Sequence, residues 1–199
     1  MNASWLKVHP TAGSGDVNVN VSALQKHNGR VARMAIVTWK AANVDNKVRR
    51  VVQHGNKEYV DIDDAAYSPK EGKVVTISGT SNAAKLTFSL GIGNLDISLP
   101  SSYIANSLTV ENGADIPGDP GAANEYEFSI SINVPSNDDV TENNRQIIVT
   151  DEAGNQDVCL LTIAAGEPYI WIAEGDIELD YLGTPVIVEV KSNTSWTIE

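Results

Sequence analysis

The sequence predicts an all-β protein built from antiparallel β-sandwiches, and three features of the chain predict it. Val, Ile and Thr, which favour strands, make up 50 of the 199 residues, whereas stretches of good helix formers are nearly absent. Apolar and polar residues alternate in many short segments. Clusters of Gly, Asn, Asp and Pro separate these segments without helical connectors, which favours antiparallel sandwiches over a parallel βαβ sheet.

Alternation marks each expected strand. Residues 16–21 place three Val on one face and polar residues on the other, as a strand with one buried face does. The other expected strands are, in chain order, 34–39, 48–53, 74–78, 85–90, 94–99, 125–134, 146–150, 158–163, 169–172 and 186–190. The breakers between them are 11–15, 68–72, 113–121, 136–144 and 152–155.

An internal repeat organises these strands. Residues 33–38 (RMAIVT) recur as RQIIVT 112 positions later, and residues 59–62 (YVDI) recur as YIWI 110 positions later. The pair Ser81-Asn82 recurs as Ser192-Asn193, and residues 2–5 (NASW) match 193–196 (NTSW). Three copies of one register are therefore present.

The spacing of the repeat predicts the organisation of the chain. The Asn of the tetrapeptide and the Arg of the strand motif are 31 residues apart in the first unit and 63 in the second, so the second unit carries about 32 extra residues. We expect a sandwich lacking its leading strands at 1–57 and a second sandwich at 58–167, with an insertion around 91–124. Residues 168–199 are expected to be the leading strands of a third unit.

The repeat resembles the BACON family of immunoglobulin-like β-sandwich modules, found in proteins of gut Bacteroidetes and of their crAss-like bacteriophages. The shared features are a strand-rich lead ending in SNTSW at 192–196, the motif RMAIVT at 33–38, and a strand closing in Gln53. In the second unit Lys85 stands where Trp is expected, and Ile163 or a neighbour replaces the Gln. The resemblance implies tandem Ig-like antiparallel β-sandwiches, in a family associated with carbohydrate and often serving as spacers.

The net charge of −12 conceals an uneven distribution. Residues 1–57 hold nine Lys or Arg against two Asp, a balance of +7, and the remaining 142 residues carry −19. Within 168–199 the balance is −5. Such a split indicates a partner of opposite charge, contact between parts or copies of the chain, or chance clustering of solubilising charge.

Several classes of protein are excluded or not expected. No stretch of 18 apolar residues occurs, so a helical membrane span is excluded, and the first fifteen residues lack the apolar run of a secretion signal. We expect neither membrane insertion nor a Sec-exported precursor. The single cysteine, Cys159, lies in an apolar run, which excludes an internal disulfide and a Cys-rich metal site.

Catalytic motifs are absent from the sequence, and we expect a protein that is not an enzyme and uses no cofactor. His9, His27 and His54 lie near turn residues without the spacing of a zinc site. Acidic clusters at 61–64, 115–119 and 137–139 carry oxygen ligands suited to Ca²⁺, but acidic turns are ordinary on sandwiches. We therefore assign no metal site.

Three aromatic residues are candidates for carbohydrate binding, because a flat ring stacks on the apolar face of a sugar. Tyr169 and Trp171 share one face of an expected strand, and Trp39 closes the strand at 34–39. The alternative, which we favour, is that these rings fill the sandwich or a junction between units.

The sharpest hypothesis is strand complementation, because 168–199 contains the strands that 1–57 lacks. An incomplete sandwich exposes its core and a sheet edge, which a segment of matching register and opposite charge can close, within one chain or between copies. The alternative is that the chain is a fragment of a longer array of such units, with arbitrary boundaries. The expected interface residues are Arg33, Lys40, Lys47, Arg49 and Arg50 on the basic face, and Glu174, Asp176, Glu178 and Asp180 on the acidic tail. Neither interleaved aromatics nor a known motif supports a nucleic-acid partner.

Together these observations predict a structural or adhesion module without enzymatic activity. We expect an accessory or decoration protein on the surface of a phage virion, whose partners are other copies of itself or other structural proteins. The alternative is a carbohydrate-binding or spacer module at the bacterial cell surface or outside the cell, with surface glycans as ligands.

Overall fold

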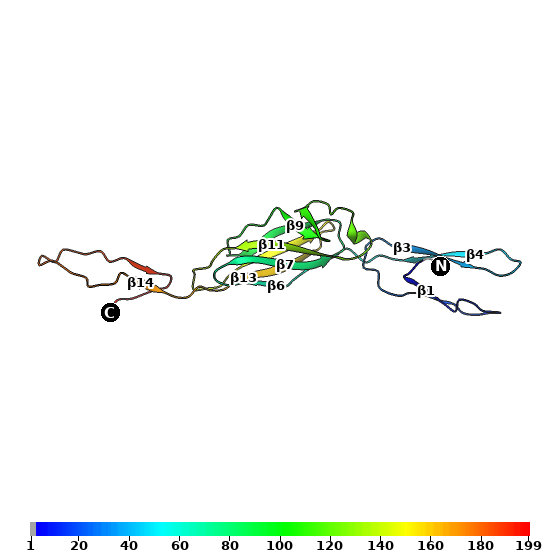
Figure 1. The fold of residues 1–199 in the computed structure, drawn as a ribbon, viewed down its shortest axis with the longest axis horizontal. Helices are drawn as coiled ribbons and strands as arrows, with labels where there is room; N and C mark the ends of the chain where they lie inside the picture. Colours follow the sequence, from blue (N-terminus) through cyan, green and yellow to red (C-terminus); the bar gives the residue numbers. More distant parts are fainter. Residues whose placement is uncertain (1–2) are drawn as a thin grey trace.

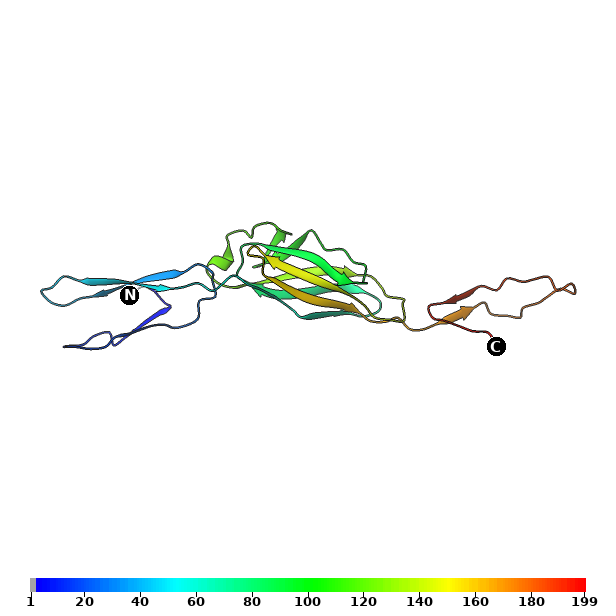
Figure 2. The ribbon, with the colours of Figure 1, turned by 180° about the vertical axis from the view of Figure 1, so that it is seen from behind.

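A computed structural model describes residues 3–199 as three β-rich parts arranged along one line (Figure 1). The N-terminal unit (3–57) lies at one end, the central unit (58–167) in the middle, and the C-terminal segment (168–199) at the other end. The view from behind shows the same order (Figure 2). The chain forms several sheets that are almost entirely antiparallel, so the all-β fold expected from the sequence is confirmed.

The central unit contains two sheets that enclose one core. The first sheet has, in spatial order, β10 (Leu108–Glu111), β9 (Ser102–Ala105), β11 (Tyr126–Val134), β7 (Lys73–Ser81) and β5 (Val60–Ile62). The second has β6 (Ala65–Ser68), β13 (Gln156–Ile163), β12 (Asn143–Asp151) and β8 (Leu86–Gly93). Neighbouring strands are antiparallel except β6 and β13, which pair in parallel.

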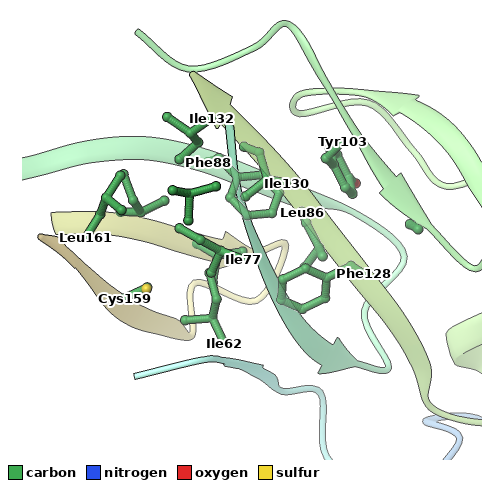
Figure 3. Packing of buried hydrophobic residues seen from close by; sticks show 14 of the residues in the cluster. Ile62, Ile77, Leu86, Phe88, Tyr103, Phe128, Ile130, Ile132, Cys159 and Leu161 are labelled. Carbon is green, nitrogen blue, oxygen red and sulfur yellow. The ribbon is translucent and has the colours of Figure 1, made fainter. Parts of the chain in front are cut away.

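Side chains from the inner faces of the two sheets form this core (Figure 3). The strand β11 shows why: Phe128, Ile130 and Ile132 alternate with outward Ser residues, so every second side chain is buried. Phe128 packs edge-on against Phe88 of the opposite sheet, with ring centroids 5.8 Å apart. The hydrophobic effect of this burial favours a stable central unit.

The N-terminal unit is two separate hairpins. In one, β1 (Leu6–His9) pairs with β2 (Asn20–Ala23); in the other, β3 (Arg33–Trp39) pairs with β4 (Lys47–Gln53). Within residues 3–57 the buried hydrophobic side chains are Leu6, Ala35 and Val37, which form a small cluster. Asn2, the first residue of the NASW copy, lies outside the described residues.

The C-terminal segment is one open hairpin that repeats the start of the central unit. Here β14 (Ile170–Ile172) pairs with β15 (Val190–Ser192), with Ile170 opposite Ser192. In the central unit Val60 stands opposite Ser81 in the same register. Most side chains of the hairpin are exposed to solvent, because no second sheet covers either face.

Some expected elements differ from those observed. Residues 94–99 are not a strand, although Leu95 is buried and Ile97 and Leu99 pack against the core. The alternation there directs side chains inward without a pairing strand. Five short strands, β1, β5, β6, β9 and β10, and the single-turn 3₁₀ helix η1 (Pro120–Ala122) were not among the expected elements. The residue opposite Arg145, as Gln53 is opposite Arg33, is Leu161 and not Ile163.

Candidate functional site

The junction between the N-terminal and central units is built around Asn82, a buried residue that follows β7. Its Oδ1 accepts the backbone N–H of Tyr59 at 3.0 Å. Its Nδ2 donates to the carbonyl oxygens of Lys57 and Asn28, both at 3.0 Å. A primary amide offers two donors and an acceptor on one group, so this side chain joins the linker, a loop of the N-terminal unit and the start of β5.

Asn193 builds the same arrangement between the central unit and the C-terminal segment. Its Oδ1 accepts the N–H of Tyr169 at 2.9 Å, and its Nδ2 donates to the carbonyl oxygens of Glu167 at 2.9 Å and Asp138 at 2.7 Å. Each partner lies 110 positions after its counterpart at the first junction. The two junctions therefore repeat in hydrogen bonds as well as in sequence.

Two further contacts repeat at both junctions. Ser81 Oγ donates to the carbonyl of Tyr59 at 2.7 Å, and Ser192 Oγ donates to that of Tyr169 at 2.7 Å. The loops beside the linkers also match, because the N–H of Asn56 donates to Gly29 at 2.9 Å, and the N–H of Gly166 donates to Asp139 at 2.7 Å. These contacts are local to the linkers, so the geometry is encoded by the repeat itself.

The first junction carries an additional ion pair. The Arg30 guanidinium donates two hydrogen bonds of 2.7 Å to the carboxylate of Asp119, which precedes η1. The backbone N–H groups of Arg30 and Val31 donate to the carbonyl oxygens of Gly121 and Ala122, respectively, both at 3.0 Å. A bidentate pair combined with backbone bonds fixes orientation as well as distance.

Glycine permits the close approach of the two units. A Cβ built on Gly121 would overlap the carbonyl group of Asn82, and one on Gly29 would overlap the backbone of Ala123. These atoms are backbone, which cannot move aside as a flexible side chain does. Glycine is therefore needed where the main chains of the two units meet.

Electrostatics at this junction follow from its charges. The hydrogen bond from Arg30 lowers the pKa of Asp119, and the same contact raises the pKa of Arg30. Burial raises the pKa of the nearby Glu58, and the neighbouring Glu152 adds to this effect. Arg30 Nη2 lies 4.0 Å from Glu152, so the guanidinium is the positive centre of an acidic cluster.

The aromatic candidates do not form one site. Trp39 lies in the N-terminal unit, whereas Tyr169 and Trp171 lie in the C-terminal segment beyond the central unit. All three rings are exposed to solvent. The ammonium group of Lys191 lies 5.2 Å from the centroid of the Trp171 ring. The structure therefore offers two separate aromatic surfaces.

Each aromatic surface lies beside a hollow. One hollow, of about 590 Å³, has Trp39 on its wall together with Val8, Val17, Val19 and Val37. The other, of about 380 Å³, lies at the second junction. Its walls include Tyr169, Asn193 and Asp138 but not Trp171.

The charged candidates lie at opposite ends of the chain. Lys40, Lys47, Arg49 and Arg50 are exposed in and beside the β3–β4 hairpin. Arg33 is half-buried instead: its Nε donates to Gln53 at 2.9 Å, and its guanidinium lies 4.8 Å from the Trp5 ring centroid. The acidic residues Glu174, Asp176, Glu178 and Asp180 are exposed in the C-terminal segment. The structure does not bring the two sets together within one chain.

Several groups from the acidic clusters and from the acidic tail have local structural contacts. Asp63 accepts the N–H of Ser78 at 2.9 Å, and Asn137 donates to the carbonyls of Thr141 and Ala164, both at 2.9 Å. Asp180 accepts hydrogen bonds from Thr184, which lower its pKa. Within residues 3–199 no three His, Cys, Asp or Glu side chains are grouped to hold a metal ion.

The repeat marks Asn82 and Asn193 in the sequence but does not indicate their role in the junctions. The recurrence of Ser-Asn directly after a strand was the available signal. The sequence carries no corresponding signal for Arg30 and Asp119, which are 89 positions apart and have the local sequence of ordinary surface charges.

No family model matches the chain, and no curated protein matches it either. Among residues 3–199 no helix is long and apolar enough to cross a membrane.

Proposed function

We propose that the chain is part of a tandem array of Ig-like β-sandwich modules with a structural or adhesive role and no catalytic activity. The observation that carries this proposal is the repetition of the Asn82 junction at Asn193. A junction that recurs in its hydrogen bonds holds successive units at a defined orientation, as an extended spacer requires. Modules joined by free linkers need no such contacts.

The strand order supports an Ig-like module. In the central unit the leading strand is shared between the sheets, because β5 pairs with β7 in one and β6 pairs in parallel with β13 in the other. The remaining order, β11–β7 against β13–β12–β8, matches the B–E and G–F–C strands of an immunoglobulin sandwich. Along the chain, the strands β9 and β10 come after β8 and before β11, within the expected insertion.

The BACON resemblance provides two settings for such an array. In the first, the chain is an accessory or decoration protein on a phage virion. Mass spectrometry of purified virions tests this setting directly, since the chain must be present at a fixed ratio to the major capsid protein. In the second, it is a spacer or carbohydrate-binding module at a bacterial surface.

A distance measurement tests the defined junction. Spin labels at Thr38→Cys and Ser89→Cys, both exposed positions, report the distance between the N-terminal and central units in the presence of excess unlabelled chain. We expect a narrow distribution that Arg30→Gln broadens. Arg50→Gln removes an equal charge from an exposed strand position and is the matched control. A broad distribution in the unmodified chain would contradict the proposal.

The exposed ring of Trp171 specifically favours a second candidate function, carbohydrate adhesion. Its counterpart in the central unit, Asp61, is also exposed, whereas the next residue, Ile62, is buried. A ring at this position therefore faces outward in a complete sandwich. Affinity electrophoresis in polysaccharide gels should show retardation that Trp171→Ala or Trp39→Ala abolishes and Trp196→Ala, another exposed Trp, leaves intact. Equal migration of all four proteins would eliminate this function.

A further inference from the structure

We propose that the C-terminal segment of one copy completes the N-terminal unit of a second copy by strand addition, so that the chain assembles head to tail. The inference rests on the proposed function in one respect, because it takes both ends as parts of the same sandwich as the central unit. It adds the partner, which is a second copy of this chain, and the register of the contact.

The N-terminal unit has apolar side chains without a covering sheet. Residues 17–24 (VNVNVSAL) repeat residues 128–135 (FSISINVP) of the central unit, 111 positions later. In the central unit Phe128 is 2% exposed because β11 pairs with β7 and faces the second sheet, whereas its counterpart Val17 is 49% exposed. Among residues 3–57 there is no counterpart of β7, and β2 pairs with β1 alone.

The hollow beside Trp39 lies where the missing strands belong. Its wall includes Val8 and Val37. Val8 follows the Asn of NASW by six residues, as Phe88 follows Asn82, and Val37 lies 112 positions before Val149. Phe88 and Val149 are buried in the core of the central unit. Val17 and Val19, in the counterpart of β11, already lie on its wall. The hollow is therefore the open half of a sandwich core, and the side chains missing from it are those that β7 supplies in the central unit.

The C-terminal segment carries the matching side chains. Residues 184–192 repeat β7 at a distance of 111 positions, which aligns Val188 with Ile77. Ile77 is fully buried, whereas Val188 is 39% exposed. The pairing of β14 with β15 already has the register of β5 with β7, so the segment presents two leading strands in their assembled arrangement.

The geometry of the chain favours a second copy as the partner. The N-terminal unit and the C-terminal segment lie at opposite ends of the central unit in both views (Figures 1 and 2). Asn193 ties the segment to its own central unit as Asn82 ties the central unit to the N-terminal one. Because the junctions repeat along one line, addition of further copies extends a filament and does not close a ring.

Charge favours the same contact. The N-terminal unit and the segment carry opposite charge, +7 for residues 1–57 and −5 for 168–199. In the central unit the N–H of Leu160 donates to the carbonyl of Asp64 at 2.9 Å, and the counterparts of these residues are Val52 and Glu174. The docked segment therefore places Glu174 and Asp176 along the strand that carries Arg49 and Arg50.

The register of the contact can be tested with cysteines. Ser131 stands opposite Thr76 on the outer face of the central unit, with their hydroxyl oxygens 3.0 Å apart. Their counterparts in the proposed contact are Asn20 and Ile187. Asn20→Cys/Ile187→Cys should oxidise to a ladder of disulfide-linked multimers, and an equal mixture of the two single variants should give one linked dimer. Asn20→Cys/Glu189→Cys is out of register and should form far less.

Disulfides that close within single chains, or equal yields from the matched and shifted pairs, would overturn the inference.

A second measurement uses sedimentation velocity over a range of concentrations. We expect a mass that rises with concentration and falls with added salt. Val188→Asp, on the face that docks, should reduce the protein to monomers, whereas Ile187→Asp, on the opposite face, should not.

A chain that stays monomeric would also overturn the inference. Its failure is distinguishable from failure of the proposed function. A monomeric chain with a narrow inter-unit distance retains the tandem spacer and loses the assembly. A chain that assembles but has a broad distribution of inter-unit distances retains the assembly and loses the tandem spacer.

Discussion

The guanidinium of Arg30 and the carboxylate of Asp119 are joined by two hydrogen bonds of 2.7 Å. The two residues are 89 positions apart in the sequence and belong to different units. Neither group is needed for the core of its own unit. Their pairing is instead a property of the junction, where it supplements the backbone bonds to Gly121 and Ala122. The orientation of the N-terminal unit should therefore depend on the charge state of this pair.

Acidification should loosen the first junction only at low pH. The pKa of Asp119 is lowered by Arg30, so its stabilising effect is present above its ordinary value of 3.8 and is lost as pH falls through the lowered pKa. The pKa of Glu58 is raised by burial, so protonating it as pH falls stabilises the folded state. We expect the distance distribution between units to stay narrow down to about pH 4 and to broaden below it.

Asp119→Asn is the control for this titration. It removes the ionisable group, so the low-pH broadening should disappear and the junction should be loose at every pH. A distribution that broadens between pH 7 and 5 in the unmodified chain would contradict the assignment of the junction to Asp119.

Gly121→Ala should disrupt the contact between units more than a glycine substitution elsewhere in the same loop. The new Cβ would overlap the carbonyl group of Asn82. Gly118→Ala meets open space, and its φ of 75° alone should cost about 1–2 kcal/mol. Chemical denaturation should show a larger loss for Gly121→Ala. Equal losses would mean that the backbones separate without penalty.

Alternation predicted the long strands well because a half-buried strand has a side-chain period of two residues. The strands β3, β11 and β12 follow it clearly. The four-residue strands β6 and β9 are too short to show a period. Residues 94–99 alternate but form no strand, because alternation records which way side chains point and not whether the backbone pairs with a neighbour.

The junctions were only partly predictable for a different reason. Asn82 and Asn193 repeat in sequence because the same amide contacts are needed twice. Arg30 and Asp119 occur once, and nothing in their local sequence distinguishes them from solvated charges. Pairing of such groups is set by how the units meet, which sequence periodicity does not report.

Cys159 should be unreactive in the folded chain. It is fully buried, and burial, followed by the nearby carboxylates of Asp63, Asp64 and Asp157, raises its pKa to about 11. The thiolate fraction at pH 8 should then be on the order of 100-fold below that of a free cysteine. A thiol reagent should label the unfolded chain rapidly and the native chain slowly. Rapid native labelling would mean that β13 opens readily.

The two alternating segments of the repeat should respond oppositely to truncation. Ile130 is 2% exposed in the core of the central unit, so Ile130→Ala should lower its free energy of unfolding by about 2–5 kcal/mol. Val17, in the matching segment of the N-terminal unit, is half exposed, so Val17→Ala should change stability by less than about 0.5 kcal/mol in dilute protein. In the assembled chain, docking covers Val17, and the same substitution should weaken association.

The positions of the aromatic residues allow the stability of the central unit and that of the two ends to be measured separately. All four Trp residues lie outside the central unit, at positions 5, 39, 171 and 196, whereas Tyr103 and Tyr126 are buried within its core. Trp fluorescence therefore reports the two ends, and the near-ultraviolet circular dichroism of tyrosine reports the centre. Ile130→Ala should shift the tyrosine transition alone. Val17→Ala should leave both transitions in place at low concentration and shift the Trp transition only where assembly occurs, because only there does Val17 gain a covering strand.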